Sequence, residues 1–112
     1  MKARIPGQNN QSQAAMMKQV QKMQEDMTSL QSELEEREFS ASAGGGMVEV
    51  TMNGRHELKK LHIDPSAIDP DDAEMLEDYI TIAINNVVKD IADTSEREMS
   101  AITGGLNIPG LF

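Results

Sequence analysis

A chain of 112 residues has room for one small domain, which buries only about 60–70% of the surface of its unfolded chain. It contains no cysteine, which excludes disulfides and thiolate metal sites, and no apolar run approaches the roughly 18 residues that a membrane span requires. The net charge of −9, taken as one number, argues against indiscriminate nucleic-acid binding. We expect one soluble, cytoplasmic domain with no membrane partner.

The charges are unevenly distributed along the chain. Residues 1–24 contain four basic side chains and no acid, whereas residues 64–78 contain seven acids and no Lys or Arg. Because salt screens charges beyond about 8–10 Å, the charge near a surface decides what it binds. Two interpretations stay open: a molecule polarised between a basic and an acidic part, and a uniformly acidic one.

The first third of the chain predicts a tail followed by a long helix. Residues 1–12 are polar and contain Pro-Gly, which is typical of a flexible tail. Over residues 13–37, apolar residues recur at spacings of four and three, which predicts a helix with a heptad seam. Packing along a second helix is the main interpretation, and a Met-rich binding surface is the alternative. The seam consists of Met16, Val20, Met23, Met27, Leu30 and Leu34.

Residues 38–64 predict a three-stranded antiparallel sheet. Small and apolar residues alternate with polar ones over 38–43 and again over 48–53, as expected of strands with one buried face. The three glycines of 44–46 separate these strands, and a flexible connection explains them better than a phosphate-binding loop, because no helix follows.

The second hairpin has an ambiguous register. A two-residue turn would place charged residues on the apolar face, so we expect a three-residue loop through Arg55, which pairs Val50 with Leu58. The next apolar residues, Leu61 and Ile63, would then lie on the polar face of the sheet. A β-bulge near Lys59 and Lys60 would restore the register and turn both lysines outward.

The remainder of the chain predicts a second long helix over 71–103 and a tail over 104–112. We expect Asp69 to cap the helix and Pro70 to occupy its first turn. Besides a core stripe, the helix carries a second apolar face with Tyr79 and Ile82, which is wider than a small monomer needs and indicates a homodimer. The tail is apolar; it docks on a partner or stays free.

Few residues could carry catalysis or bind a cofactor. His56 and His62, with Asp64 nearby, are the only candidates for metal ligands, and their positions on a strand with a bulge do not ensure a shared face. No nucleophile motif and no pair of carboxylates in an apolar setting is present. We therefore expect no enzyme activity, metal, cofactor or small-molecule substrate.

Several motifs together resemble those of the YbaB/EbfC family of bacterial nucleoid-associated DNA-binding proteins. The resemblance covers nearly the whole chain from about residue 14, with agreement in order and spacing. It implies an α+β protomer of order α-β-β-β-α, a homodimer formed through the sheet, and long helices that project like the arms of a tweezer. It also implies binding to duplex DNA with limited sequence preference, a change in DNA conformation, and a place on the nucleoid. The motifs are Ser42–Val50, Asn53-Gly54 with Glu57-Leu58, Ile63–Ser66, Glu74–Asp78 and Thr103–Leu106.

The family offers no single base-reading motif, so the contact residues are inferred from charge and pattern alone. Duplex DNA is held largely through Lys and Arg on its phosphates, and we expect weak, salt-sensitive, mostly backbone-directed binding. A prefoldin-like holdase, or another helical-arm protein without a DNA partner, is the alternative function. The inferred DNA-binding residues are Lys2, Arg4, Lys18, Lys22, Arg55, Lys59 and Lys60. The inferred dimer interface consists of Val48, Val50, Met52, Leu58, Tyr79 and Ile82.

Overall fold

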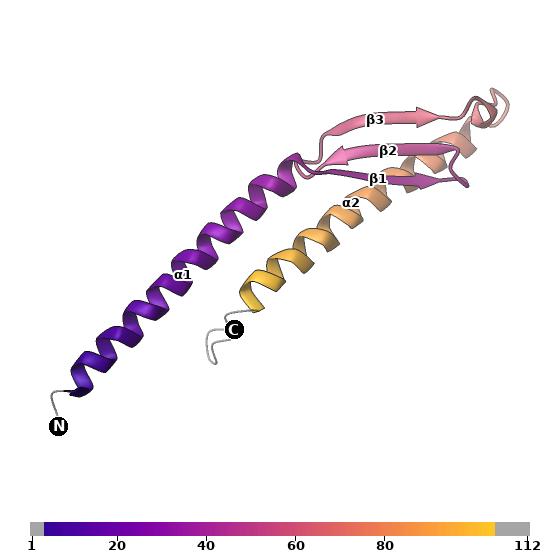
Figure 1. Cartoon of the computed structure of the whole chain (residues 1–112). Coiled ribbons are helices and arrows are strands. Elements are labelled where there is room, and N and C mark those ends of the chain that lie inside the picture. Colours follow the sequence, from indigo (N-terminus) through magenta and orange to yellow (C-terminus); the bar gives the residue numbers. More distant parts are fainter. Residues whose placement is uncertain (1–3, 105–112) are drawn as a thin grey trace.

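Two long helices flank a small sheet in the computed structural model, which describes the backbone of residues 4–104 and the side chains of residues 13–104. The element order confirms the expected α-β-β-β-α protomer and its α+β class (Figure 1). The elements are α1 (Arg4–Glu36), β1 (Glu38–Ala43), β2 (Val48–Asn53), β3 (Leu58–Ile63), the short 3₁₀ helix η1 (Pro65–Ala67) and α2 (Ala73–Gly104).

Helix α1 begins at Arg4, so residues 4–12 are helical where we expected a flexible tail. Pro6 is compatible with this start because it lies in the first turn, where backbone N–H groups have no intrahelical acceptor. The 33 residues of α1 make a helix of about 50 Å at 1.5 Å per residue. The predicted tail over 104–112 lies outside the described residues, except for Gly104, which ends α2.

The three strands form one antiparallel sheet in the order β1-β2-β3. The second hairpin turns one residue later than expected, so that Met52 pairs with Leu58, and Val50 pairs with Leu61 rather than with Leu58. The side chain of Asn53 accepts hydrogen bonds from the backbone N–H groups of Arg55 and Glu57, which stabilises this later turn. Local hydrogen bonds of this kind are not encoded in the apolar pattern.

The predicted β-bulge is confirmed. The register between β2 and β3 shifts opposite Thr51 and Met52, which leaves Lys59 as the extra residue between two paired ones. Both Lys59 and Lys60 are exposed, as the restored alternation requires. In the turn before the bulge, His56 adopts a left-handed backbone conformation with φ 66°.

Helix α2 crosses the apolar face of the sheet and covers β1 and β2, while β3 lies beyond its cover (Figure 1). Val48 and Val50 are almost completely buried there, against Ala83 and Val87 of α2. On the same face of β3, Ile63 is half-buried against this core, whereas Leu58 and Leu61 are 44% and 43% exposed. The apolar face consists of Phe39, Ala41, Ala43, Val48, Val50, Met52, Leu58, Leu61 and Ile63.

Helix α2 begins at Ala73, two residues later than expected, and its cap is Asp72 rather than Asp69. The Asp72 carboxylate accepts a hydrogen bond from the backbone N–H of Met75 at 3.3 Å, the usual contact of an N-cap side chain. Asp69 instead accepts from the backbone N–H of Asp71 at 2.9 Å and so closes a turn before the helix.

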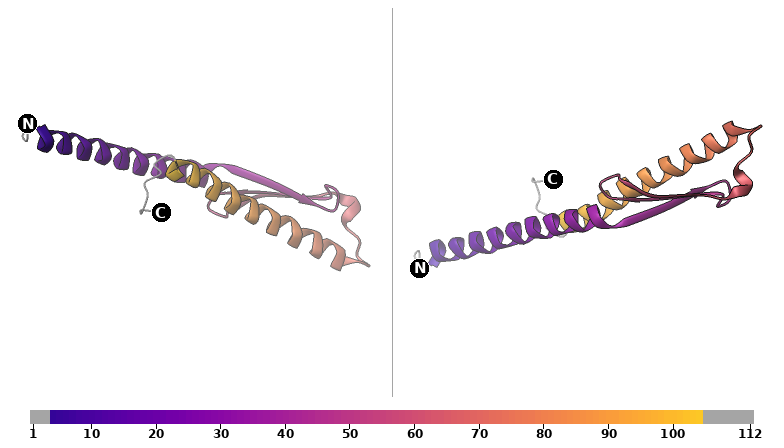
Figure 2. Two further views of the ribbon diagram at one scale, coloured as in Figure 1. Left: turned by 90° about the horizontal axis from the view of Figure 1, so that it is seen from below. Right: turned by 90° about the horizontal axis from the view of Figure 1, so that it is seen from above.

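The protomer is elongated, with extents of 87 × 23 × 15 Å and a radius of gyration of 23.0 Å. A compact domain of this length has a radius of gyration of about 13 Å. Figures 1 and 2 show the cause: α2 runs back along the C-terminal part of α1 only, so that the N-terminal half of α1 projects away from the rest of the protein. The projecting half of α1 buries little surface within one chain.

Candidate nucleic-acid interface

The projecting half of α1 presents two lysines and no acid. We call residues 13–24 the outer arm; among its described side chains, Lys18 and Lys22 are the charged ones, and both are exposed. Lys22 lies 3.5 Å from Asp26 in a solvent-exposed i,i+4 pair, which is a weak interaction. Each lysine is two residues from Val20, so its side chain emerges about 200° around the helix from the apolar seam. The outer arm therefore has a basic side and an apolar side.

The inner part of α1 has the opposite charge. Residues 25–36 contain five acids and no Lys or Arg. Asp26 compensates part of the charge of Lys22, but Glu33, Glu35 and Glu36 lie at least about 16 Å further along the helix, beyond the screening distance of about 8–10 Å. An approaching polyanion is consequently attracted to the outer arm and repelled closer to the sheet.

The basic residues of the hairpin are not gathered with those of the outer arm. Arg55 lies 3.3 Å from Glu35 and 3.4 Å from Glu36, so its charge is compensated where the hairpin meets the end of α1. Lys59 lies 3.8 Å from Glu57. Lys60 is exposed and has no carboxylate within 4.0 Å among the described side chains, on the polar face of the sheet.

Two further candidates lie at the N-terminal end. Lys2 lies outside the described residues, and Arg4 is the first residue of α1, with a side chain that is not described. Among the five inferred DNA-binding residues with described side chains, Lys18 and Lys60 have no described carboxylate within 4.0 Å, Lys22 and Lys59 each have one, and Arg55 has two.

The acidic residues of 64–78 lie at the far end of the molecule from the outer arm (Figure 1). Part of this charge stabilises turns. Asp64 accepts hydrogen bonds from the backbone N–H and the hydroxyl of Ser66, at 2.9 and 2.7 Å, and these bonds lower the pKa of Asp64. With basic charge at one end and acidic charge at the other, the described structure favours the polarised molecule over the uniformly acidic one.

Three ionic side chains tie the base of α1 to α2. The Arg37 guanidinium donates to the carboxylate of Glu98 at 2.6 and 3.0 Å, and its Nε donates to Glu33 at 2.8 Å. These hydrogen bonds lower the pKa of both glutamates and raise that of Arg37. Charge-assisted, bidentate contacts of this type fix geometry as well as adding stability, so they help to set the direction in which the outer arm projects.

A second contact at this junction involves only backbone. A Cβ atom added to Gly54 would lie 2.6 Å from the carbonyl carbon of Leu34 and closer still to its oxygen. The tip of the hairpin thus lies directly against the last turn of α1, and only glycine permits so close an approach.

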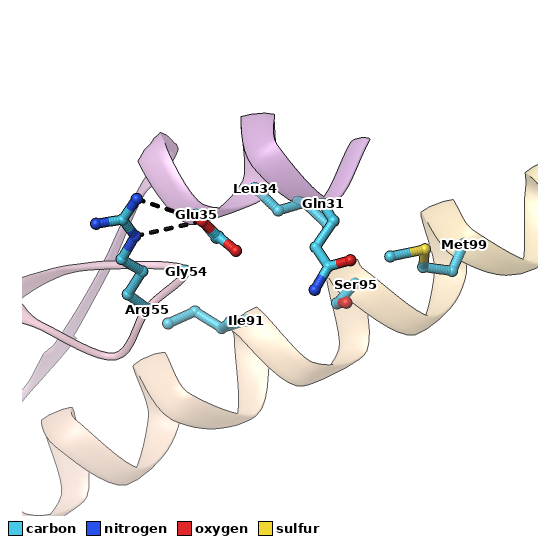
Figure 3. A pocket seen from close by; sticks show the side chains of 8 residues that line it. All are labelled: Gln31, Leu34, Glu35, Gly54, Arg55, Ile91, Ser95 and Met99. Atoms are coloured by element: carbon cyan, nitrogen blue, oxygen red, sulfur yellow. Dashed lines mark hydrogen bonds and ion pairs between the residues drawn. The ribbon is translucent and has the colours of Figure 1, made fainter. Parts of the chain in front are cut away.

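A crevice of about 320 Å³ opens beside this junction, between the end of α1, the hairpin and α2 (Figure 3). Its one ionic feature is the pair of Glu35 and Arg55, and no nucleophile with an adjacent base lines it. Within residues 13–104, no cluster of three or more His, Cys, Asp or Glu side chains is suited to a metal ion. His56 lies in the turn before β3, and His62 lies near the other end of that strand. The lining residues are Gln31, Leu34, Glu35, Gly54, Arg55, Ile91, Ser95 and Met99.

The inferred dimer-interface residues are divided between the core and the surface. Val48, Val50 and Met52 are at most 6% exposed and belong to the protomer's own core beneath α2. Tyr79 is half-buried against the Gly44 turn. Leu58 and Ile82 are 44% and 48% exposed and remain available to a partner.

Sequence reasoning missed three features of this region. The Arg37–Glu98 tie joins residues 61 positions apart, and no local pattern indicates it. The close approach at Gly54 had one signal, the Asn-Gly pair, which we interpreted only as a turn. Leu61, 43% exposed on the apolar face of β3, was missed because the expected register was displaced.

No helix in the described part of the chain has a stretch long and apolar enough to cross a membrane.

Comparison with known proteins identifies the family. The model of the YbaB/EbfC DNA-binding family matches residues 8–106. A nucleoid-associated protein of Pelotomaculum thermopropionicum is 53% identical over 97 residues, which cover 87% of this chain and 92% of the relative. A nucleoid-associated protein of Clostridium novyi is 52% identical over 97 residues, covering 87% and 85% respectively.

A solved structure shares the fold as well. The crystal structure of an uncharacterized protein from Helicobacter pylori aligns with a TM-score of 0.57 and 28% identity, over 70% of this chain and 90% of that one. The match of the family model over most of the chain, together with relatives above 50% identity, leads to one conclusion. The chain belongs to the YbaB/EbfC DNA-binding family.

Proposed function

We propose that this protein binds duplex DNA on the bacterial nucleoid as a homodimer, mainly through phosphate contacts with limited sequence preference, and thereby alters DNA conformation or gene expression. The observation that carries the proposal is the family membership combined with a projecting, acid-free outer arm that exposes Lys18 and Lys22. Contacts of such side chains with phosphates release counterions and carry no information on base sequence.

The homodimer is supported by the uncovered part of the sheet. Leu58 and Leu61 of β3 lie on the same face as the core residues of β2, yet each is more than 40% exposed, because α2 does not reach over β3. A second protomer that covered β3 would complete this face. Two copies would also double the number of outer arms, so that each duplex could meet two pairs of lysines.

The dimer is tested by substituting one residue of this face. Leu61→Glu should shift the mass measured by multi-angle light scattering from dimer towards monomer. Ile68→Glu is the matched control, because Ile68 is 57% exposed but lies after η1 and away from the sheet. Equal dimerisation of the two variants would remove β3 from the interface.

DNA contact by the outer arm is tested by charge reversal. We expect Lys18→Glu combined with Lys22→Glu to abolish retardation of a duplex in a gel while the dimer persists. Single Lys18→Gln should make the slope of log affinity against log salt shallower by about 2, one for each protomer. Lys89→Gln is its control, since Lys89 is equally a lysine of an exposed helix face but pairs with Asp93 at 2.9 Å. Unchanged binding by the folded double variant would remove the outer arm from the site.

A holdase with helical arms remains the second candidate, because Met16 and Met17 of the outer arm are 49% and 66% exposed. It predicts that the protein suppresses aggregation of an unfolded client at physiological salt and ignores duplex DNA. Binding of DNA without such suppression rejects it.

A further inference from the structure

We propose that residues 105–112 bind along the apolar side of the outer arm of the same chain. We call this side, together with Met27 one turn further along the helix, the outer seam; it consists of Met16, Val20, Met23 and Met27. Binding of this segment would cover the apolar side of the arm, and it does not depend on whether the protein binds DNA.

The outer seam continues a stripe that is covered only at its inner end. Leu34, in the last turn of α1, is 6% exposed because it packs into the core beside the hairpin and α2. Along the same stripe toward the N-terminus, Met23 and Met27 are half-buried and Met16 is 49% exposed. An apolar stripe that continues from the core into solvent is typical of a surface that binds another segment or molecule.

The C-terminal end of α2 lies beside the inner end of the outer seam. Glu98 of α2 is held level with Glu33 of α1, because both carboxylates bind the same Arg37 guanidinium. The two helices run in opposite directions with the same rise per residue, so Gly104, six residues beyond Glu98, lies about level with residue 27 of α1. Figures 1 and 2 agree with this, since in each view α2 ends beside α1 and the N-terminal half of α1 extends beyond that end.

The following segment is long enough to cover the outer seam. From Met27 to Met16 the helix rises about 16 Å. The eight residues 105–112 can span up to about 27 Å when extended. No rearrangement of the folded part is therefore needed for the segment to reach every residue of the seam.

The chemistry of the segment matches the surface. Residues 105–112 have no charged side chain, and Pro109 prevents them from simply continuing α2. Lys18 and Lys22 emerge on the opposite side of the arm, so a segment bound along the seam would leave the basic side open. The apolar residues that would contact the seam are Leu106, Ile108, Leu111 and Phe112.

Disulfide trapping in the full chain tests the proposal, because the protein has no cysteine of its own. Asn107→Cys is combined with Gln24→Cys, which lies one turn from Val20 at the edge of the seam. The matched control combines Asn107→Cys with Glu25→Cys, which lies at nearly the same height but about 100° further around the helix. All seam and segment residues with apolar side chains are retained in both variants.

We expect an intrachain disulfide to form at least about 10-fold faster in the Gln24→Cys variant than in the control, since a disulfide requires Cβ atoms about 4 Å apart. Equal rates in the two variants would overturn the proposal. A disulfide that forms chiefly between chains, seen as a band of doubled mass, would also overturn it and would assign the seam to the segment of a second copy.

Methionine oxidation provides a second measurement without cysteines. Leu111→Ser with Phe112→Ser should raise the rate of sulfoxide formation at Met23 and Met27 several-fold, while Met52 in the core stays unchanged and reports that the fold is intact. Oxidation of Met23 and Met27 at the wild-type rate in this variant would contradict the binding of the segment to the seam.

Discussion

Gly54→Ala probes the junction that positions the arm relative to the sheet. The added Cβ would meet the carbonyl carbon of Leu34 at 2.6 Å, where carbon atoms normally approach to about 3.5 Å. The hairpin or the last turn of α1 must then move by about 1 Å, and because the obstacle is backbone, no side-chain rotation can relieve the clash. Overpacking of this kind costs about 1–3 kcal/mol, and we expect the upper end.

The assay is thermal unfolding followed by circular dichroism at one fixed protein concentration, since association makes the midpoint concentration-dependent. A loss of about 3 kcal/mol corresponds to a fall in Tm of roughly 10 °C for a chain of this size. Gly104→Ala is the control: nothing lies within 4 Å of its added Cβ, and Tm should stay level or rise, because alanine favours a helix. A Gly54→Ala protein that melts within about 1 °C of the wild type would refute the close approach.

Two further substitutions test the turn and the ionic tie. His56→Val should lower the free energy of unfolding by about 1 kcal/mol, because a β-branched residue resists the left-handed conformation at φ 66°, whereas His56→Gly should be neutral or stabilising in the same urea titration. Arg37→Met should lower stability at pH 7 by less than Gly54→Ala does, since the ionic groups are partly exposed. Arg37 lowers the pKa of Glu33 and Glu98 from the ordinary value of 4.5, so the tie contributes above that pH and is lost as the pH falls through the folded-state pKa. Wild-type stability should therefore drop more steeply than that of Arg37→Met between about pH 5 and pH 3, and parallel acid profiles would contradict the assignment.

In the sheet, the bulge could be predicted from the sequence, whereas the register could not. Because side chains alternate strictly along a strand, the mismatch between Leu58 and Leu61 could be resolved only by a bulge, and the bulge lies at Lys59. The register could not be derived in the same way. It depends on Asn53 accepting two backbone hydrogen bonds and on the left-handed conformation of His56, and the apolar pattern contains no information on either.

The sequence allowed only part of the candidate site to be predicted. Lys18 and Lys22 could be predicted as exposed, because the heptad seam fixes which side of α1 is apolar. The fate of Arg55 could not be predicted, since its partners Glu35 and Glu36 come from an element about 20 residues earlier and meet it only through the fold. The same limit applies to Val48, Val50 and Met52: the pattern showed that they share an apolar face, but not that α2 of the same chain covers it.

Duplex DNA binding measured by fluorescence anisotropy, in a salt series from about 50 to 200 mM, tests the central claim most directly. If Lys18, Lys22 and Lys60 of two protomers contact phosphates, the plot of log affinity against log salt should have a slope of about −5. Duplexes of unrelated sequence should give nearly the same line, because phosphate contacts carry no sequence information. The absence of binding at 50 mM salt, or an affinity that does not change with salt, would contradict the account.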